Sequence, residues 1–182
     1  PPTSDVFYRD GDGFLLSDEH HQPFAARNAG QPLPIGSATP PDFPARPDRP
    51  ELLDPRDVPR RRPGSPAGRL ALLHAVAHIE LNAVDLHWDI IARFSHHPMP
   101  LGFYDDWVKA ADEESKHFNL VSDRLEALGS HYGALPAHAG MWRAAADTAQ
   151  DFMGRLAVVP MVLEARGLQA LSEAGGGMKG GR

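Results

Sequence analysis

The sequence predicts an all-α protein, from two observations that divide its 182 residues into unequal parts. Fourteen of the 18 prolines fall within residues 1–66, where a fixed φ and a missing amide donor exclude regular helix. From residue 67 onward apolar residues recur at i, i+3, i+4 and i+7, as in amphipathic helices, and strand signals are absent. We therefore expect an extended Pro-rich arm over residues 1–66, a helical domain over residues 67–171 and a Gly-rich tail over residues 172–182.

The first two helices can be placed from their end signals. Ser65 is a suitable N-cap and Pro66 suits the first turn, so the first helix should cover residues 67–94. The segment SHHPMPLGF then interrupts the helical pattern. A second helix should begin near residues 104–106, where acidic residues suit a helix N-terminus, and should stop at Gly129.

A third helical region should cover residues 140–171, with a kink at Pro160, which cannot donate a hydrogen bond and crowds the carbonyl group of Leu156. The arm also carries apolar side chains such as Phe14 and Phe43. Because a purely solvated linker has few of these, we expect the arm to wrap over the helical domain.

Composition excludes several classes of function. The net charge of −6 and pI near 5.9 give no general attraction to nucleic acid or to an anionic membrane. The absence of cysteine excludes disulfides, thiolate metal sites and thiol catalysis, so any metal must be bound by His, Asp or Glu. No apolar run approaches the roughly 18–20 residues that span a bilayer, and we expect a cytoplasmic protein.

Three glutamates occupy helical faces that are otherwise apolar. The residues three, four and seven positions from Glu80, Glu114 and Glu164 are almost all apolar, and His117 shares the face of Glu114. By contrast, Glu113 and Glu126 share their faces with polar or charged residues. The first group should therefore point inward and the second group into solvent.

Buried carboxylates require a partner. A carboxylate in an apolar interior costs several kcal/mol unless it is protonated, paired or bound to a metal. Residues three apart on a helix share one face, so Glu114 and His117 can converge on one ion. Carboxylate oxygens with one imidazole suit iron or manganese. The alternative is a buried hydrogen-bond network without a metal.

The order Glu80, then E-x-x-H at Glu114 and His117, then Glu164 is similar to that of ferritin-like di-iron carboxylate bundles, which add a second E-x-x-H on a fourth helix. More narrowly, the stretches LLHAVAHIELNAVDLHWD, EESKHFNLVSDRLEALGSHYGALPAH and RLAVVPMVLEARGL resemble an uncharacterised bacterial family of ferritin-like proteins, a domain of unknown function. The resemblance covers about residues 45–169. It implies that Glu80 and His117 hold a first metal, that Glu114 bridges and that Glu164 serves a second metal.

The chain departs from the ferritin-like pattern after residue 171, where LSEAGGGMKGGR replaces the expected fourth helix. Three glutamates and one histidine suffice for one well-held ion but are few for two. The expected cofactor is therefore iron or manganese, with one or two ions per site. Either a second copy or a partner chain completes the bundle, or residues are lost, or the site is mononuclear or inactive.

Four further residues are candidates for supporting roles. His74 and His78 are four residues apart on another face of the first helix and form either a second ligand pair or core hydrogen bonds. His87 shares the face of Glu80 about 10 Å further along, as a supporting or channel residue. Arg166 pairs with an acid, binds an anionic substrate or lies on the surface.

The expected function is that of an iron- or manganese-dependent oxidase or oxygenase, an oxidoreductase that uses dioxygen and a small-molecule substrate. The competing expectation is a non-catalytic bundle: a metal-storage or interaction protein, or a pseudo-enzyme whose buried acids no longer serve catalysis. No membrane or nucleic-acid partner is expected.

Overall fold

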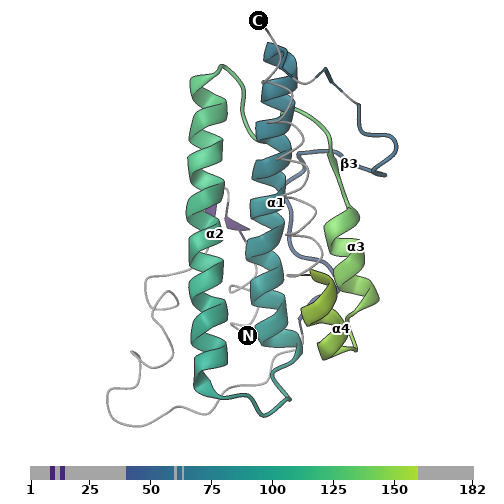
Figure 1. Ribbon diagram of the computed structural model, residues 1–182, viewed down its shortest axis with the longest axis vertical. Coiled ribbons are helices and arrows are strands. Elements are labelled where there is room, and N and C mark those ends of the chain that lie inside the picture. The colour runs from purple at the N-terminus through teal and green to yellow at the C-terminus, as the bar shows by residue number, and fades with distance from the viewer. Residues whose placement is uncertain (1–8, 11–12, 15–39, 60, 63, 160–182) are drawn as a thin grey trace, which may run out of the picture.

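Two long helices, α1 (Pro66–Arg93) and α2 (Leu101–Ala127), lie side by side, and two short helices, α3 (Gly140–Asp147) and α4 (Phe152–Leu156), lie on the other side of α1 (Figure 1). This computed structural model describes residues 9–10, 13–14, 40–59, 61–62 and 64–159. The predicted kink at Pro160, the side chains of Glu164 and Arg166 and the expected tail lie outside the described residues.

The start of α1 confirms the prediction within one residue. Ser65 has extended backbone angles, and its hydroxyl group accepts a hydrogen bond from the amide of Gly68 at 3.0 Å. Pro66 occupies the first turn, where its missing N–H group would have had no partner. One of the free amide groups at the helix start is thus satisfied by a side chain.

Replacing Ser65 with alanine should lower the free energy of unfolding by about 1 kcal/mol, because the amide of Gly68 loses this partner. Urea denaturation of the wild type and the variant measures the change. Ser130, in the loop after α2, supplies the control, because Ser130→Ala removes a hydroxyl group that caps no helix. Equal effects of the two substitutions would contradict the capping role.

Helix α2 begins at Leu101, three residues before the earliest predicted start. Pro100 has extended angles (φ −62°, ψ 151°) and forms the boundary itself, so the acidic residues further on are not needed as a start signal. The C-terminus confirms the prediction of a stop at Gly129, which has φ +76°. The amide of Ser130 donates to the carbonyl of Leu125 at 2.9 Å, which is the Schellman arrangement.

The third helical region is broken earlier than predicted. Residues 148–151 separate α3 from α4. The side chains of Thr148 and Asp151 bind backbone groups on either side of this break. The Thr148 hydroxyl group donates to the carbonyl of Ala144 at 2.9 Å, and Asp151 accepts from the amide of Gly154 at 2.9 Å. Both side chains serve backbone groups at helix ends, so the sequence did contain a stop and a start signal here.

The described residues include four very short strands, although strand signals are absent from the sequence. Strands β1 (Arg9–Asp10) and β2 (Gly13–Phe14) pair in antiparallel fashion, and β3 (Leu52–Leu53) pairs in parallel with β4 (Ala137–His138). Each strand has two residues, which is too short to give an alternating pattern in the sequence. The fold nevertheless remains mostly helical.

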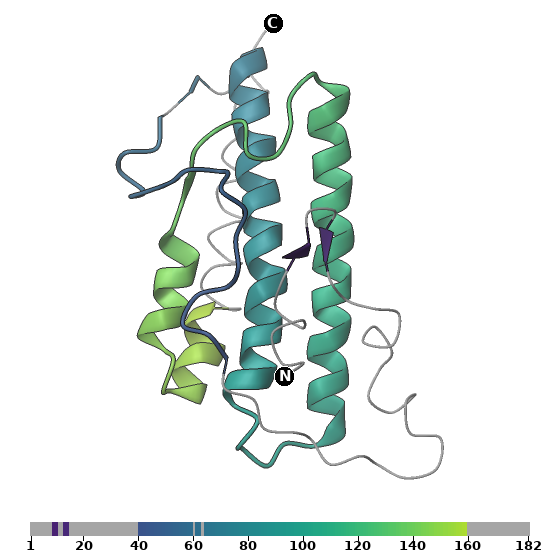
Figure 2. The same cartoon turned by 180° about the vertical axis from the view of Figure 1, so that it is seen from behind.

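The longest described stretch of the arm, residues 40–59, runs along α1 next to α3 (Figure 2). Arg46 reaches α1, with 2.8 Å to the side-chain oxygen of Asn82 and 2.9 Å to the carboxylate of Asp85. The carbonyl group of Asp42 accepts from the indole N–H of Trp142 at 2.8 Å. This segment therefore packs on the helices, whereas the wrapping of the whole arm and the division into arm, domain and tail stay predictions.

Helix α1 contributes to each of three groups of buried side chains. The first two lie against α2 and the third against α3 and the residues after α4. Their members are Ala77, Leu81, Phe118 and Leu125; Val84, Trp88, Ala92, Val108 and Ala111; and Leu86, Met141, Trp142, Ala145 and Val159. Because α1 is packed on both sides, its remaining face can carry polar groups. Among the described helices, none is both long and apolar enough to cross a membrane.

Candidate metal centre

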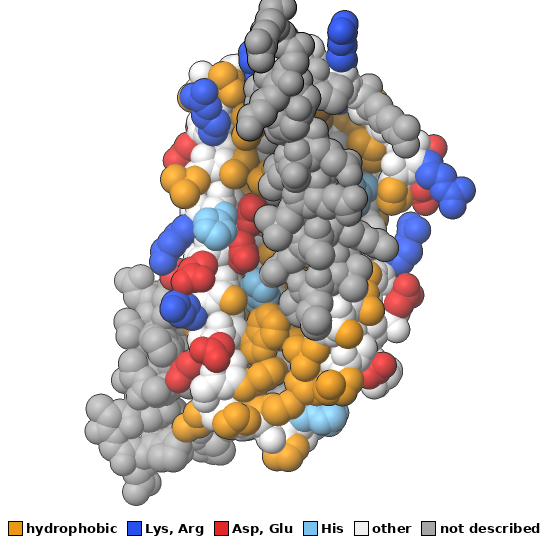
Figure 3. Space-filling model, in the orientation of Figure 1, with side chains coloured by type: hydrophobic (Ala, Val, Ile, Leu, Met, Phe, Trp, Pro, Cys, Tyr) orange, Lys and Arg blue, Asp and Glu red, His pale blue; other side chains and the backbone are white. Residues whose placement is uncertain are grey.

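Glu80 of α1 meets Glu114 and His117 of α2 at the same level of the two helices. One ligand atom from each residue lies within 4.8 Å of the other two. In Figure 3, acidic and histidine side chains lie together on the face where α1 and α2 meet. The structure therefore brings together three of the four predicted ligands, and the fourth, Glu164, lies outside the described residues.

The Nδ1 atom of His117 lies between the two carboxylates. It is 2.9 Å from Oε2 of Glu114 and 3.7 Å from Oε2 of Glu80. Atoms that bind one transition-metal ion at 2.0–2.2 Å lie at most about 4.4 Å from one another. Small rotations of these side chains would thus allow all three to contact one ion.

The charges of the cluster depend on one another. Burial raises the pKa of Glu80 to about 7, and hydrogen bonding and repulsion from Glu114 add to the effect. Burial also acts to raise the pKa of Glu114, but hydrogen bonds with Glu80 and His117 outweigh it and lower the pKa. The hydrogen bond to Glu114 raises the pKa of His117. The two carboxylates and the imidazole thus share protons, and a metal cation could replace these protons.

The cluster is less buried than the sequence suggested. The side chains of Glu80 and Glu114 are 20% and 22% exposed, and that of His117 is 55% exposed. The apolar neighbours of Glu114 on its own helix predicted an inward direction, which is correct for the two acids. His117 lies at the edge of the α1/α2 contact, one helical turn from Leu120, which is itself 66% exposed.

His87 is buried two turns along α1 from Glu80, and its Nδ1 atom has no hydrogen-bond partner among the described residues. Its ring packs on Trp107 of α2, with 5.1 Å between ring centroids. Burial lowers the pKa of His87 to about 4, and the negative charge of Glu114 acts in the opposite direction. This electrostatic link supports the predicted supporting role beside the cluster, which stays a prediction.

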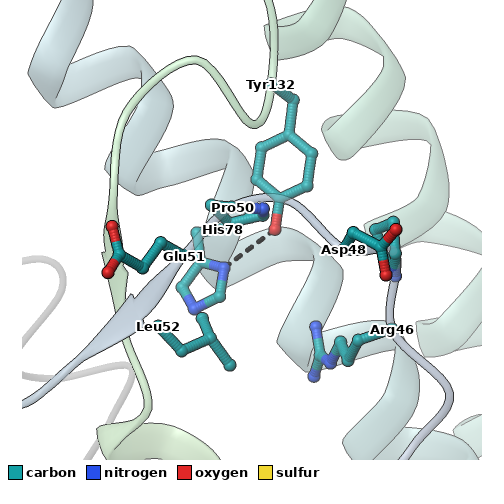
Figure 4. Close-up of a pocket in the computed structure, with 8 residues that line it drawn as sticks. Arg46, Asp48, Pro50, Glu51, Leu52, His78 and Tyr132 are labelled. Atoms are coloured by element: carbon teal, nitrogen blue, oxygen red, sulfur yellow. Dashed lines mark hydrogen bonds between the residues drawn. The ribbon is translucent and has the colours of Figure 1, made fainter.

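His74 and His78 serve a different part of the chain, the loop that follows α2. The Nδ1 atom of His78 is 2.8 Å from the hydroxyl group of Tyr132 (Figure 4), and its Nε2 atom is 3.0 Å from the carbonyl of His138. The Nε2 atom of His74 accepts from the amide of Gly133 at 2.9 Å. These contacts correspond to the core hydrogen bonds that were the alternative to a second ligand pair.

Two buried aspartates of α1 were missed by the sequence reasoning, which tested only glutamates. Asp85 and Asp89 are 4% and 2% exposed. Asp85 pairs with Arg46, and Asp89 pairs with Arg93 and Arg155. The same face test would not have found Asp89, because the residues three, four and seven positions away are mostly polar, Asp85 and Arg93 among them.

Comparisons with known proteins give no function. Residues 15–175 match the sequence profile of a family described as "Protein of unknown function (DUF455)". A relative from Haemophilus influenzae, described as an uncharacterized protein, is 47% identical over 131 residues, which cover 69% of this chain and 46% of the relative. The chain thus spans about half the length of this curated relative. No solved structure matches.

Proposed function

Since the chain belongs to the DUF455 family of uncharacterised proteins, we propose a function from its own geometry: Glu80, Glu114 and His117 bind an iron or manganese ion. The observation that carries the proposal is the convergence of the three ligand atoms within 4.8 Å, from two helices. Two carboxylates and one imidazole form a donor set that suits these metals.

The state of the cluster without a metal supports this proposal. Burial and the neighbouring Glu114 hold the pKa of Glu80 near 7, so the pair of acids retains a proton close to neutral pH. A divalent cation would neutralise both carboxylates and make that proton unnecessary. The fit is chemical as well as geometric, because each of the three residues offers an oxygen or a nitrogen lone pair.

We further propose that the metal-loaded protein is an oxidoreductase of the ferritin-like di-metal carboxylate type. A bound iron or manganese ion, once reduced, would supply the redox chemistry toward dioxygen that side chains lack. The residues of this chain would orient the ion, and the buried ring of His87 beside Trp107 would limit the access of water on one side. The substrate would be a small molecule that reaches the exposed side of His117.

Metal analysis of the purified protein tests the first step. The wild type, loaded with Fe(II) or Mn(II) under anaerobic conditions and then desalted, should retain one ion per chain at this cluster, or two where the di-metal type applies. A protein that retains no metal above the level of a metal-free control would end the metal proposal. Consumption of dioxygen by the reduced, loaded protein would support the oxidoreductase step, and its absence would contradict that step alone.

Replacing Glu114 with glutamine should weaken the binding of Mn(II) by about a hundredfold, because it removes a charged ligand that contacts both other members of the cluster. Titration calorimetry measures the dissociation constant. The matched control is Glu113→Gln, since Glu113 is the next residue and faces away, 3.8 Å from Lys109. Similar losses in both variants would show that the ion responds to general charge and not to this cluster.

The second function, a non-catalytic metal-binding or interaction protein, is favoured by one observation. Among the described residues the cluster contains three ligands, and the side chain of His117 is 55% exposed. An ion held in this way exchanges readily. Light scattering of the loaded protein distinguishes storage, which predicts large assemblies, from a small metal-binding protein.

A further inference from the structure

A second charged group lies near the C-terminal end of α1, where one acid is shared by two arginines. Arg93 binds the carboxylate of Asp89 through Nε, at 3.0 Å from both oxygens, and through Nη2, at 2.7 Å from Oδ1. Arg155 of α4 donates to Oδ2 of the same carboxylate. The side chains of Asp89 and Arg155 are 2% and 1% exposed, and that of Arg93 is 12% exposed. One buried and one partly buried cation thus share one anion.

Among the described residues, the hydrogen bonds of the two arginines do not involve the Nη1 group of Arg93. Arg93 also donates from Nη2 to the carbonyl of Pro41 at 2.9 Å, whereas no described residue accepts from its Nη1 atom. Arg155 is held in the protein by Thr148, at 2.9 Å from Nε, and by the carbonyl of Ala145, at 2.6 Å from Nη2. Arg93 is therefore fixed in one orientation by its Nε and Nη2 atoms, and none of the residues that the structure describes binds the two N–H groups of Nη1.

Arg93 lines two adjoining cavities. One has a volume of about 240 Å³, and its other lining groups include Arg155, Trp142, Phe43 and several alanines of α3. The second has a volume of about 330 Å³ and is more polar, with His96 and Gln150 in its lining. Arg93 and Asp42 belong to both linings. A cationic group thus lies where an apolar cavity meets a polar one.

We propose that this site binds a small organic anion, whose carboxylate or phosphate group pairs with Arg93 and whose apolar body lies against Trp142 and Phe43. An excess buried positive charge is costly unless an anion neutralises it. Guanidinium N–H groups that are already fixed in orientation bind carboxylate and phosphate oxygens with little further loss of entropy. The apolar lining can bury the aromatic or aliphatic part of this ligand.

Asp42 is the competing anion among the described residues. It lines both cavities, but the ion pairs of the described residues do not include one between Asp42 and Arg93. A carboxylate in the lining also repels an incoming anion. Asp42 should therefore weaken the binding of the ligand rather than take its place.

The site is separate from the metal cluster. Asp89 follows Glu80 by nine residues, which corresponds to about 13 Å along α1. The proposal does not rest on the metal, and the protein can be tested without it.

Titration calorimetry with phenyl phosphate, benzoate, inorganic phosphate and benzyl alcohol tests the proposal on the metal-free protein. Phenyl phosphate should bind at one site, more tightly than inorganic phosphate, and benzyl alcohol should not bind measurably. In Arg93→Gln the dissociation constant should rise by about tenfold or more, because a charged hydrogen bond is lost. That variant leaves Asp89 paired with Arg155 in a one-to-one pair, so the fold should be retained.

The control is Arg143→Gln on α3, because the side chain of Arg143 is 61% exposed and pairs with Asp54 at 3.6 Å. It should leave the dissociation constant unchanged. Asp42→Asn should lower the dissociation constant several-fold, a gain that does not depend on the folding of the arginine variant. The proposal is overturned if neither organic anion binds, if inorganic phosphate binds as tightly as phenyl phosphate, or if Arg93→Gln and Arg143→Gln behave alike. Unchanged or weaker binding in Asp42→Asn also overturns it.

Discussion

Replacing Asp89 with asparagine should lower the free energy of unfolding by about 3–5 kcal/mol, because the substitution leaves two arginines without their shared anion. Arg155 is 1% exposed, so it cannot turn to water without opening the contact between α1 and α4. The side-chain amide of asparagine has one acceptor oxygen where the carboxylate has two, and it carries no charge. Urea denaturation followed by circular dichroism measures the loss.

The control for this prediction is Asp54→Asn. Asp54 is 43% exposed and lies 4.0 Å from Arg56 and 3.6 Å from Arg143, so its removal should change the free energy of unfolding by at most about 0.5 kcal/mol. A loss at Asp89 no larger than at Asp54 would show that the buried group does not hold the helices together. The double variant Asp89→Asn with Arg93→Gln should be less destabilised than the sum of the two single variants, because one of the unpaired cations is then gone.

Local signals in the sequence were sufficient for the helix ends that side chains or glycine determine. Ser65 and Gly129 marked the start of α1 and the end of α2, because a capping hydroxyl group and a positive φ are properties of single residues. The start of α2 was placed too late because the acids of its first turns were read as the signal, whereas Pro100 makes the boundary. Pro160 predicted a break in the third helical region, whereas the chain already leaves the helix at Thr148.

Helical faces predicted which acids of α1 and α2 converge, but they could not predict their depth. Glu80 and Glu114 were recognised from apolar neighbours on their own helices, yet the exposure of His117 depends on what packs on the outer side of α2. The sharing of Asp89 by Arg93 and Arg155 joins residues 66 positions apart in the sequence. Such a contact follows from the tertiary fold and leaves no mark in local periodicity.

Lowering the pH from 6.5 to 4 should remove about 3 kcal/mol of stability through His78 alone. Burial lowers the pKa of His78 to about 4 in the folded protein, against 6.5 for the unfolded chain. Between these values the unfolded state binds more protons than the folded state, so stability falls as the pH falls. Well above pH 6.5 both states are neutral at this residue and it adds no pH dependence. Each unit of pKa difference corresponds to about 1.4 kcal/mol.

The contribution of His78 has to be separated from those of other groups. His87, whose pKa burial also lowers to about 4, acts in the same direction, whereas the raised pKa of Glu80 stabilises the fold as the pH falls from 7 toward 4.5. The measurement is therefore the difference in unfolding free energy between the wild type and His78→Gln at a series of pH values. The variant should be less stable at pH 7, because it loses the contacts with Tyr132 and His138. This deficit should shrink by about 3 kcal/mol by pH 4, since only the wild type carries the buried imidazole. Parallel curves for the two proteins, or an NMR titration of the His78 ring near pH 6.5, would show that burial does not keep this histidine neutral.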